Sequence, residues 1–127
     1  METATTRDVQ VSVEAFYLED QSSPQERQFA FAYRVRLKNL GAARVQLLSR
    51  HWIITDSVGT VRHVKGPGVV GEQPVLEPGQ EYEYVSGSRL ESPMGTMEGT
   101  YQMVGANGEQ FDIRIPLFTL AVPGTLN

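Results

Sequence analysis

Cysteine is absent from this 127-residue sequence. Its absence excludes disulfide bonds, thiolate metal sites, iron–sulfur clusters and cysteine nucleophiles. It also fits a reducing cytoplasm, where we expect the protein to be located. Long apolar runs are missing too: none approaches the roughly 20 residues that a membrane-spanning helix needs. The polar residues 1–8 do not resemble a secretory signal. We therefore expect a soluble protein that does not insert into a membrane.

Positive charge is in the minority. Eleven lysines and arginines face fifteen aspartates and glutamates, which gives a net charge of −4. Because general nucleic-acid binding depends on a positive field, this balance argues against a nucleic-acid partner. Some cations nevertheless gather, since Arg34, Arg36 and Lys38 form a stripe on one face of a predicted strand. This stripe is either a hydrated, edge-protecting sheet face or a docking surface for an acidic partner.

Catalytic and metal-binding motifs are scarce. The two histidines, His51 and His63, lack the local spacing of a metal-ligand pair. Ser49 and His51 would lie two residues apart on one strand, without a carboxylate to orient the histidine. No G-x-S-x-G or calcium-loop motif is present. The sequence therefore predicts no catalytic residue, no metal site and no cofactor, and we expect a protein that is not an enzyme.

Sustained helical spacing is absent as well. Twelve glycines and seven prolines instead separate short stretches in which apolar and polar residues alternate, as they do in strands with one buried face. Strands are expected at 9–15, 29–38, 45–55, 60–65, 81–86, 99–104, 111–115 and 117–122. Seven or eight short strands with a turn about every ten residues predict an all-β fold, an antiparallel β-sandwich. A small closed barrel is the alternative.

The strand expected at 45–55 departs from strict alternation, because Leu47 and Leu48 are both apolar. Either both of its faces are covered, or a bulge near Ser49 and Arg50 shifts the phase. The same strand carries the single tryptophan, Trp52. We expect its side chain to be a buried anchor of the sandwich core.

Turn signals set the other boundaries. Asn107-Gly108 is the strongest hairpin signal, and Pro116 is expected to end one strand before the last begins. Loops are expected at 19–28, 66–78 and 87–95, the first of them mobile. The chain, 1–127, reads as a single domain whose ends, 1–8 and 123–127, are frayed.

The sharpest local pattern is Gly66-Pro67-Gly68-Val69-Val70-Gly71, which fits G-x-G-x-x-G. A dinucleotide site of the Rossmann type is not expected, because that motif needs a following helix and no helical pattern follows here. Two interpretations stay open. The glycines serve a tight turn between strands, or the loop directs its N–H groups at an anion. In the second case the anion-binding residues are Arg62, His63, Lys65, Gly66, Gly68 and Gly71.

Several motifs occur in a fixed order along nearly the whole chain. They are Gln46-Leu47-Leu48-Ser49-Arg50-His51-Trp52-Ile53-Ile54-Thr55-Asp56, Val69-Val70-Gly71-Glu72-Gln73-Pro74, Glu77-Pro78-Gly79, Tyr84, Ser86-Gly87, Pro93-Met94-Gly95-Thr96-Met97, Gly99, Tyr101, Phe111 and Ile115-Pro116-Leu117-Phe118. In content and order they resemble the ApaG family. Such a combination is far more specific than any one motif.

This resemblance implies an immunoglobulin-like or fibronectin type III-like sandwich, in agreement with the alternation. It also implies an association with cobalt resistance and magnesium efflux, which a protein without a membrane span would exert through another component. Similar domains in eukaryotic F-box and polymerase-interacting proteins point to protein–protein interaction. We therefore expect a cytoplasmic, monomeric binding or adaptor module whose partner is another protein. The alternative is phosphate, pyrophosphate or nucleotide-phosphate binding at 62–71.

Overall fold

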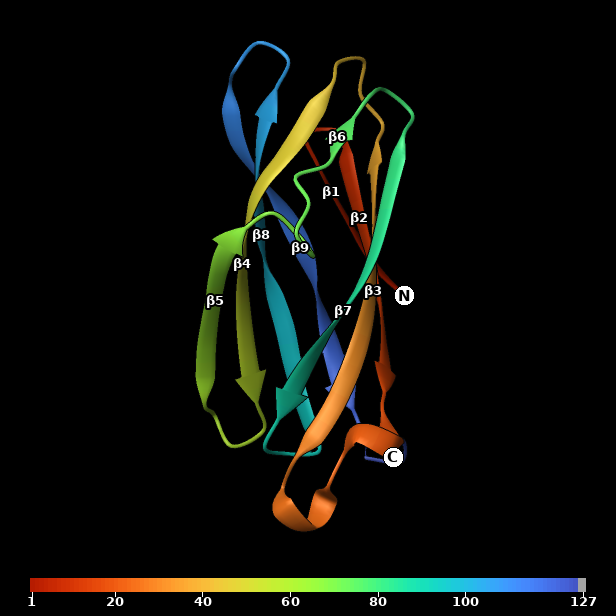
Figure 1. Ribbon diagram of the computed structural model, residues 1–127, viewed down its shortest axis with the longest axis vertical. Helices are drawn as coiled ribbons and strands as arrows, with labels where there is room; N and C mark the ends of the chain where they lie inside the picture. Colours follow the sequence, from red (N-terminus) through yellow and green to blue (C-terminus); the bar gives the residue numbers. More distant parts are fainter. Residues whose placement is uncertain (126–127) are drawn as a thin grey trace.

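The computed structural model describes residues 1–125 as two antiparallel sheets packed face to face (Figure 1). The strands are β1 (Glu2–Thr6), β2 (Val9–Tyr17), β3 (Phe29–Asn39), β4 (Val45–Asp56), β5 (Val61–Pro67), β6 (Val75–Leu76), β7 (Glu81–Leu90), β8 (Met94–Gly105) and β9 (Gln110–Ala121). The first sheet has the order β1-β2-β3-β7, and the second has the order β5-β4-β8-β9, with β6 paired to β4. The predicted all-β, immunoglobulin-like or fibronectin type III-like sandwich is confirmed, with nine strands in place of seven or eight.

Alternating apolar residues of both sheets fill the space between them. On β2, for example, Val9, Val11 and Val13 are all buried. The predicted anchor is also confirmed, because only 2% of the Trp52 surface is exposed. Its ring packs against Tyr33 and Phe118 with ring centroids 5.3 and 5.9 Å away, in edge-to-face arrangements.

Two bulges set the phase of the long strands. The β4–β8 register shifts between Leu47 and Ser49, so Leu48 is an extra residue on β4. Of the two alternatives, the bulge is therefore present, and it allows Val45 and Leu47 before it to share the inward face with Arg50 and Trp52 after it. The predicted strand end at Pro116 is wrong, because β9 runs through it. The β8–β9 register is irregular there, and a bulge tolerates a residue that has no N–H to donate.

Glycines explain why one loop is shorter than predicted. In place of a loop at 87–95, β7 extends to Leu90 and β8 begins at Met94. Glycine at 95 and 99 permits close packing of β8 on β4, since a Cβ on Gly99 would lie 2.0 Å from the main-chain oxygen of His51. Glycine therefore marks a close contact between strands here, and not a loop.

Short elements account for the remaining differences. The predicted loop at 66–78 contains the end of β5 and the two-residue β6, and the segment 19–28 contains the 3-10 turns η1 (Glu19–Gln21) and η2 (Pro24–Glu26). The expectation of a frayed start is wrong for residues 2–6, which pair with β2. At the other end Thr125 donates a main-chain hydrogen bond to Val122. The rest of the predicted frayed end, 126–127, lies outside the described residues.

The two edges of the sandwich differ. At the closed side, formed by β1, β2 and β9, Arg7 forms a 3.0 Å ion pair with Glu109, and Arg114 N donates to Thr6 Oγ1 at 3.1 Å. At the open side, β5 and β7 are the edge strands of different sheets. The hydrogen bond that crosses between them runs from Arg62 Nη2 to Arg89 O, at 2.8 Å. Within residues 1–125, no helix is long and apolar enough to cross a membrane.

Candidate functional site

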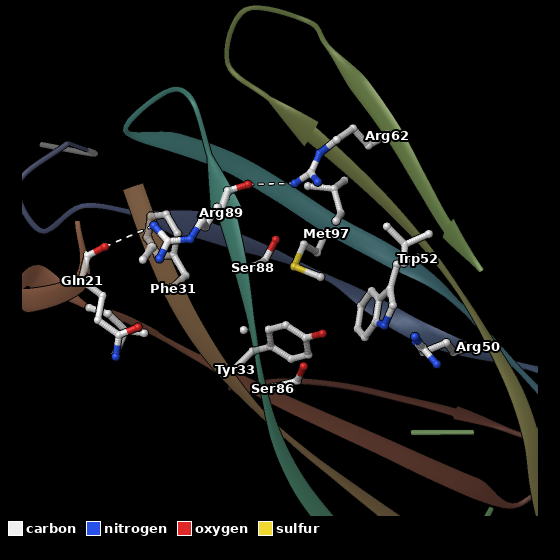
Figure 2. Close-up of a pocket in the computed structure, with 15 residues that line it drawn as sticks. Gln21, Phe31, Tyr33, Arg50, Trp52, Arg62, Ser86, Ser88, Arg89 and Met97 are labelled. Atoms are coloured by element: carbon white, nitrogen blue, oxygen red, sulfur yellow. Dashed lines mark hydrogen bonds between the residues drawn. The ribbon is translucent and has the colours of Figure 1, made fainter. Parts of the chain in front are cut away.

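A cavity of about 430 Å³ opens between the sheets at the open side. Figure 2 shows side chains from β3, β4, β5 and β7 converging on it. Its apolar part includes Phe31, Trp52 and Met97. Its polar lining consists of Gln21, Tyr33, Arg50, Arg62, Ser86, Ser88 and Arg89. Arg50 is partly buried, whereas Arg62 and Arg89 are exposed at the edge of the cavity. A sandwich interior normally holds apolar side chains, so Arg50 requires an explanation.

Arg50 is held at this cavity by the neighbouring strand of its own sheet, β5. It lies across from Gly66 in the β4–β5 ladder. Its Nη1 donates to the main-chain oxygens of Pro67 and Gly68, both at 3.0 Å. A Cβ on Gly66 would lie 3.0 Å from either terminal nitrogen of the guanidinium. Glycine at this position therefore leaves room for the Arg50 head group.

Arg62 and Arg89 form the rim of the same cavity. Arg62 bonds to Arg89 O across the gap, and Arg89 Nη1 donates to Gln21 O at 3.2 Å. A second hollow of about 330 Å³ continues beyond them and shares both arginines. Within residues 1–125, the side chains of Arg50, Arg62 and Arg89 donate only to neutral main-chain carbonyls. None of the ion pairs found among residues 1–125 involves these three arginines.

The indole nitrogen of Trp52 is buried and has no hydrogen-bond partner among residues 1–125. Figure 2 shows this nitrogen directed toward the guanidinium of Arg50. A buried donor without an acceptor costs about 1–3 kcal/mol, and such groups are rare in folded proteins. An acceptor atom of a ligand in the cavity would satisfy the indole N–H and face the arginine charge at the same time.

Buried phenols beside Arg50 keep their protons. Burial raises the pKa of Tyr33, although the Ser86 hydroxyl and the Arg50 charge oppose this effect. The hydroxyls of Tyr84 and Tyr101 are hydrogen-bonded to each other, and burial raises the pKa of both phenols. These groups are therefore neutral at ordinary pH and can donate hydrogen bonds. The described lining of the first cavity contains no carboxylate and no imidazole, so it is a donor surface without a general base.

The structure divides the predicted anion-binding residues between two faces of β5. Arg62 lines the cavity and Gly66 adjoins Arg50, whereas His63 and Lys65 occupy the alternate, exposed positions. On the outer face His63 Nδ1 lies 2.9 Å from Nε2 of His51. Desolvation and the charges of Lys65 and His63 lower the pKa of His51. In the part of the chain that the structure describes, no three His, Cys, Asp or Glu side chains group to hold a metal ion.

The glycine-rich loop uses most of its N–H groups internally. Gly68 N donates to Leu48 O at 2.8 Å, and Val69 and Glu72 exchange two hydrogen bonds across a tight turn. A Cβ on Gly68 would lie 2.3 Å from Glu72 O, and Gly71 has a φ of 82°. This geometry supports the tight-turn interpretation for Gly68 and Gly71. It leaves the loop few free N–H groups for an anion.

The basic stripe on β3 is balanced by neighbouring acids. Arg34 pairs with Glu14 at 3.3 Å and Arg36 pairs with Glu83 at 3.1 Å, on the strands at either side. The stripe therefore has the features of a hydrated sheet face with cross-strand ion pairs. Its charge is much less available to an acidic partner than the charge in the cavity.

Sequence reasoning missed Arg50, Ser86 and Ser88 as site residues. The sequence signal for these residues was their position in the alternation of their strands. Arg50 lies two residues before Trp52 and so shares its inward face, and the two serines continue the inward phase of Tyr84. Polar side chains at positions where alternation expects apolar ones are the pattern that identifies this site.

Known proteins resemble the chain closely. The model of the ApaG domain matches residues 19–105. Protein ApaG of Paramagnetospirillum magneticum is 58% identical, with 97% of this chain and 95% of that protein covered. Protein ApaG of Acidithiobacillus ferrooxidans is 54% identical, with 95% of both chains covered. The crystal structure of an ApaA protein from Bordetella pertussis has a TM-score of 0.90 at 51% identity, covering 93% of this chain and 96% of that one. The chain therefore belongs to the ApaG family.

Proposed function

We propose that this chain is a non-enzymatic binding module that holds an anionic group, carboxylate or phosphate in kind, in the cavity at its open side. The observation that carries the proposal is the buried N–H of Trp52, which lacks an acceptor beside the Arg50 guanidinium. A bound anionic oxygen would supply that acceptor. The proposal moves the phosphate site predicted at 62–71 from the glycine loop into the cavity that Arg62 lines.

The charges of the cavity support an anion over a neutral ligand. Arg50, Arg62 and Arg89 are held by main-chain carbonyls, which orient the guanidinium groups without neutralising them. Oriented guanidinium groups favour carboxylate and phosphate, whose geometry they match with paired hydrogen bonds. The net charge of −4 does not oppose this site, because partial burial strengthens local interactions relative to distant charges.

Binding fits the cavity better than catalysis does. Its one phenol, Tyr33, is protonated, its arginines supply charge, and its serines have no base within the described lining. Such a surface can orient a ligand and stabilise its charge. It has no group placed to take a proton from a nucleophile.

The wider role that we propose follows from family membership. It is a contribution to cobalt resistance and magnesium efflux in the cytoplasm, made by the monomeric chain through a second protein. A strain that lacks this protein should lose cobalt tolerance, and wild type or the exposed control Arg114→Ala should restore it. Arg50→Ala should not restore tolerance if the cavity serves this role. Full rescue by Arg50→Ala would show that cobalt tolerance does not depend on the cavity.

Titration calorimetry with inorganic phosphate and with citrate tests the binding site itself. We expect saturable binding to the wild-type chain and to Arg114→Ala. Loss of a charge-assisted contact in Arg50→Ala should weaken binding about 10- to 100-fold. The ratio of the two anions' affinities distinguishes phosphate chemistry from carboxylate chemistry. Equal binding to wild type and Arg50→Ala, or no binding of either anion, would overturn the proposed site.

A further inference from the structure

We infer that the anionic group is a side chain of an extended, acidic segment of a partner protein, which adds as a new strand to the free edge of β7. This inference rests on the proposed anion site and names its occupant. Two independent features support it: unpaired main-chain groups along β7, and arginine charge where the side chains of an added strand would point.

The main chain of β7 faces the open side at every second residue. Among the strands that the structure describes, β7 pairs with β3 alone, and Arg89 lies opposite Ala30. Ala30 directs both main-chain groups the other way, since its N donates to Ser22 Oγ and its O accepts from Leu18 N. The main chain of Arg89 therefore points off the free edge, where its oxygen accepts the bond from Arg62.

The alternation of an antiparallel ladder extends this result along the strand. Val85 and Gly87 share the parity of Arg89, so their N–H and C=O groups also point to the open side. An extended peptide can bond to such a row, as in recognition by strand addition. Residues 85–88 of β7 carry neither charge nor proline, the usual devices that block an edge.

The side chains of an added strand would alternate between the cavity and the outer face. Residues opposite Ser86 and Ser88 would point inward, because directly paired residues share a face. The small serines leave space there, and Arg50 and Arg62 supply the charge for a glutamate or aspartate. Residues opposite Val85, which is 55% exposed, would lie on the outer face and gain an apolar neighbour. The geometry thus favours a segment in which acidic and apolar residues alternate.

Inward-pointing charge is also a known protection of edge strands against aggregation. That explanation suits Arg62, which lies on the edge strand β5. It does not suit Arg50, which lies on β4 between β5 and β8. It also leaves the buried Trp52 N–H without an acceptor. A small anion would satisfy the indole and Arg50, whereas an extended peptide would also pair with the free main chain of β7.

The test uses an end-blocked eight-residue peptide of alternating glutamate and valine, with lysine in place of glutamate in the control. We expect the glutamate peptide to bind and to shift the amide resonances of Val85 and Gly87 together with the Trp52 indole resonance. The lysine peptide should not bind. Arg50→Ala should weaken the glutamate peptide at least about tenfold.

The variant Val85→Pro separates strand addition from anion binding. It removes an N–H that points off the free edge and leaves the β3–β7 hydrogen bonds intact. Inorganic phosphate should bind Val85→Pro as it binds wild type, whereas the glutamate peptide should bind at least about tenfold more weakly. A peptide N-methylated at alternate residues makes the same test on the wild-type chain. The inference would be overturned if wild type bound phosphate but not the glutamate peptide. It would also be overturned if the glutamate peptide bound equally well after Val85→Pro and after N-methylation of the peptide. If wild type did not bind phosphate, the proposed function would be overturned instead.

Discussion

The two sides of the sandwich treat charge in opposite ways. At the closed side Arg7 is paired with Glu109, and its guanidinium lies 4.5 Å from the centre of the Phe111 ring. At the open side Arg50 and Arg62 donate to carbonyl oxygens and have no carboxylate partner among the described ion pairs. One side uses arginine to join the sheets, and the other holds arginine charge ready for a ligand. The comparison predicts that closed-side changes affect stability and open-side changes affect binding.

The largest expected effect is a loss of stability at the closed side. Ile113 on β9 is fully buried, so Ile113→Ala should lower the free energy of unfolding by about 2–5 kcal/mol. Ser86→Ala at the open side should change it by less than about 0.5 kcal/mol. Urea denaturation of both variants measures the difference. Similar losses in the two variants would contradict the division between the sides.

A smaller loss is expected where the open-side strand β7 meets the interior. Tyr84→Phe leaves the buried Tyr101 hydroxyl without its partner, which should cost about 1–3 kcal/mol. Because burial raises the Tyr84 pKa above the ordinary value of 10.0, wild type should also lose stability as the pH rises past about 10. The alkaline loss should be shallower in Tyr84→Phe. Denaturant midpoints of both proteins between pH 8 and 11 measure this loss of stability. If stability fell equally with pH in wild type and Tyr84→Phe, Tyr84 would not be the source of the alkaline loss.

Gly66→Ala should affect binding while leaving stability nearly intact. The added Cβ meets the flexible end of Arg50 at 3.0 Å, so the guanidinium has to move. We expect less than about 1 kcal/mol of destabilisation and a phosphate affinity several-fold below that of wild type. Gly41→Ala, in the turn between β3 and β4, is the control. Unchanged affinity in Gly66→Ala would show that the position of Arg50 does not matter.

The smallest effect concerns the exposed ion pair of the closed side. The hydrogen bond and charge of Arg7 lower the pKa of Glu109 below the ordinary 4.5. A lowered carboxylate pKa stabilises the fold above about pH 4.5, and this contribution disappears as the pH falls through the folded value. Arg7→Ala should therefore flatten the acid limb of the stability curve slightly, as should 1 M salt. An acid limb that is identical in wild type and Arg7→Ala would exclude the ion pair as its cause.

Much of the fold was predictable because alternation reports burial directly. The strands at 9–15 and 29–38 follow from the period of two, and the break in that period made a bulge near Ser49 one of two alternatives. The burial of Trp52 follows from its place in a strand of the sandwich. The short strands were not predictable, since β6 has only two residues and its pairing with β4 is a long-range contact. Gly87 and Gly95, which bounded the loop predicted at 87–95, were misleading for a physical reason. Glycine marks both turns and close strand contacts, and only the partner strand shows which applies.

The site was predicted less well than the fold. Local sequence placed Arg62 near the right loop, but it grouped Arg62 with His63 and Lys65, which a strand places on the opposite face. The decisive contacts of Arg62 and Arg50 join residues far apart in sequence, such as the bond from Arg62 to Arg89. The unpartnered state of the Trp52 nitrogen has no sequence signal at all, because it depends on every neighbour in space.

The most direct test of the central claim is the indole N–H resonance of Trp52 during titration with inorganic phosphate. The chain has one tryptophan, so this resonance is unique. We predict a saturable downfield shift in wild type and none in Arg50→Ala, while the amide of Glu109 at the closed side stays in place. An indole resonance that does not move at saturating phosphate, or that moves equally in Arg50→Ala, would contradict an anion site at the open side.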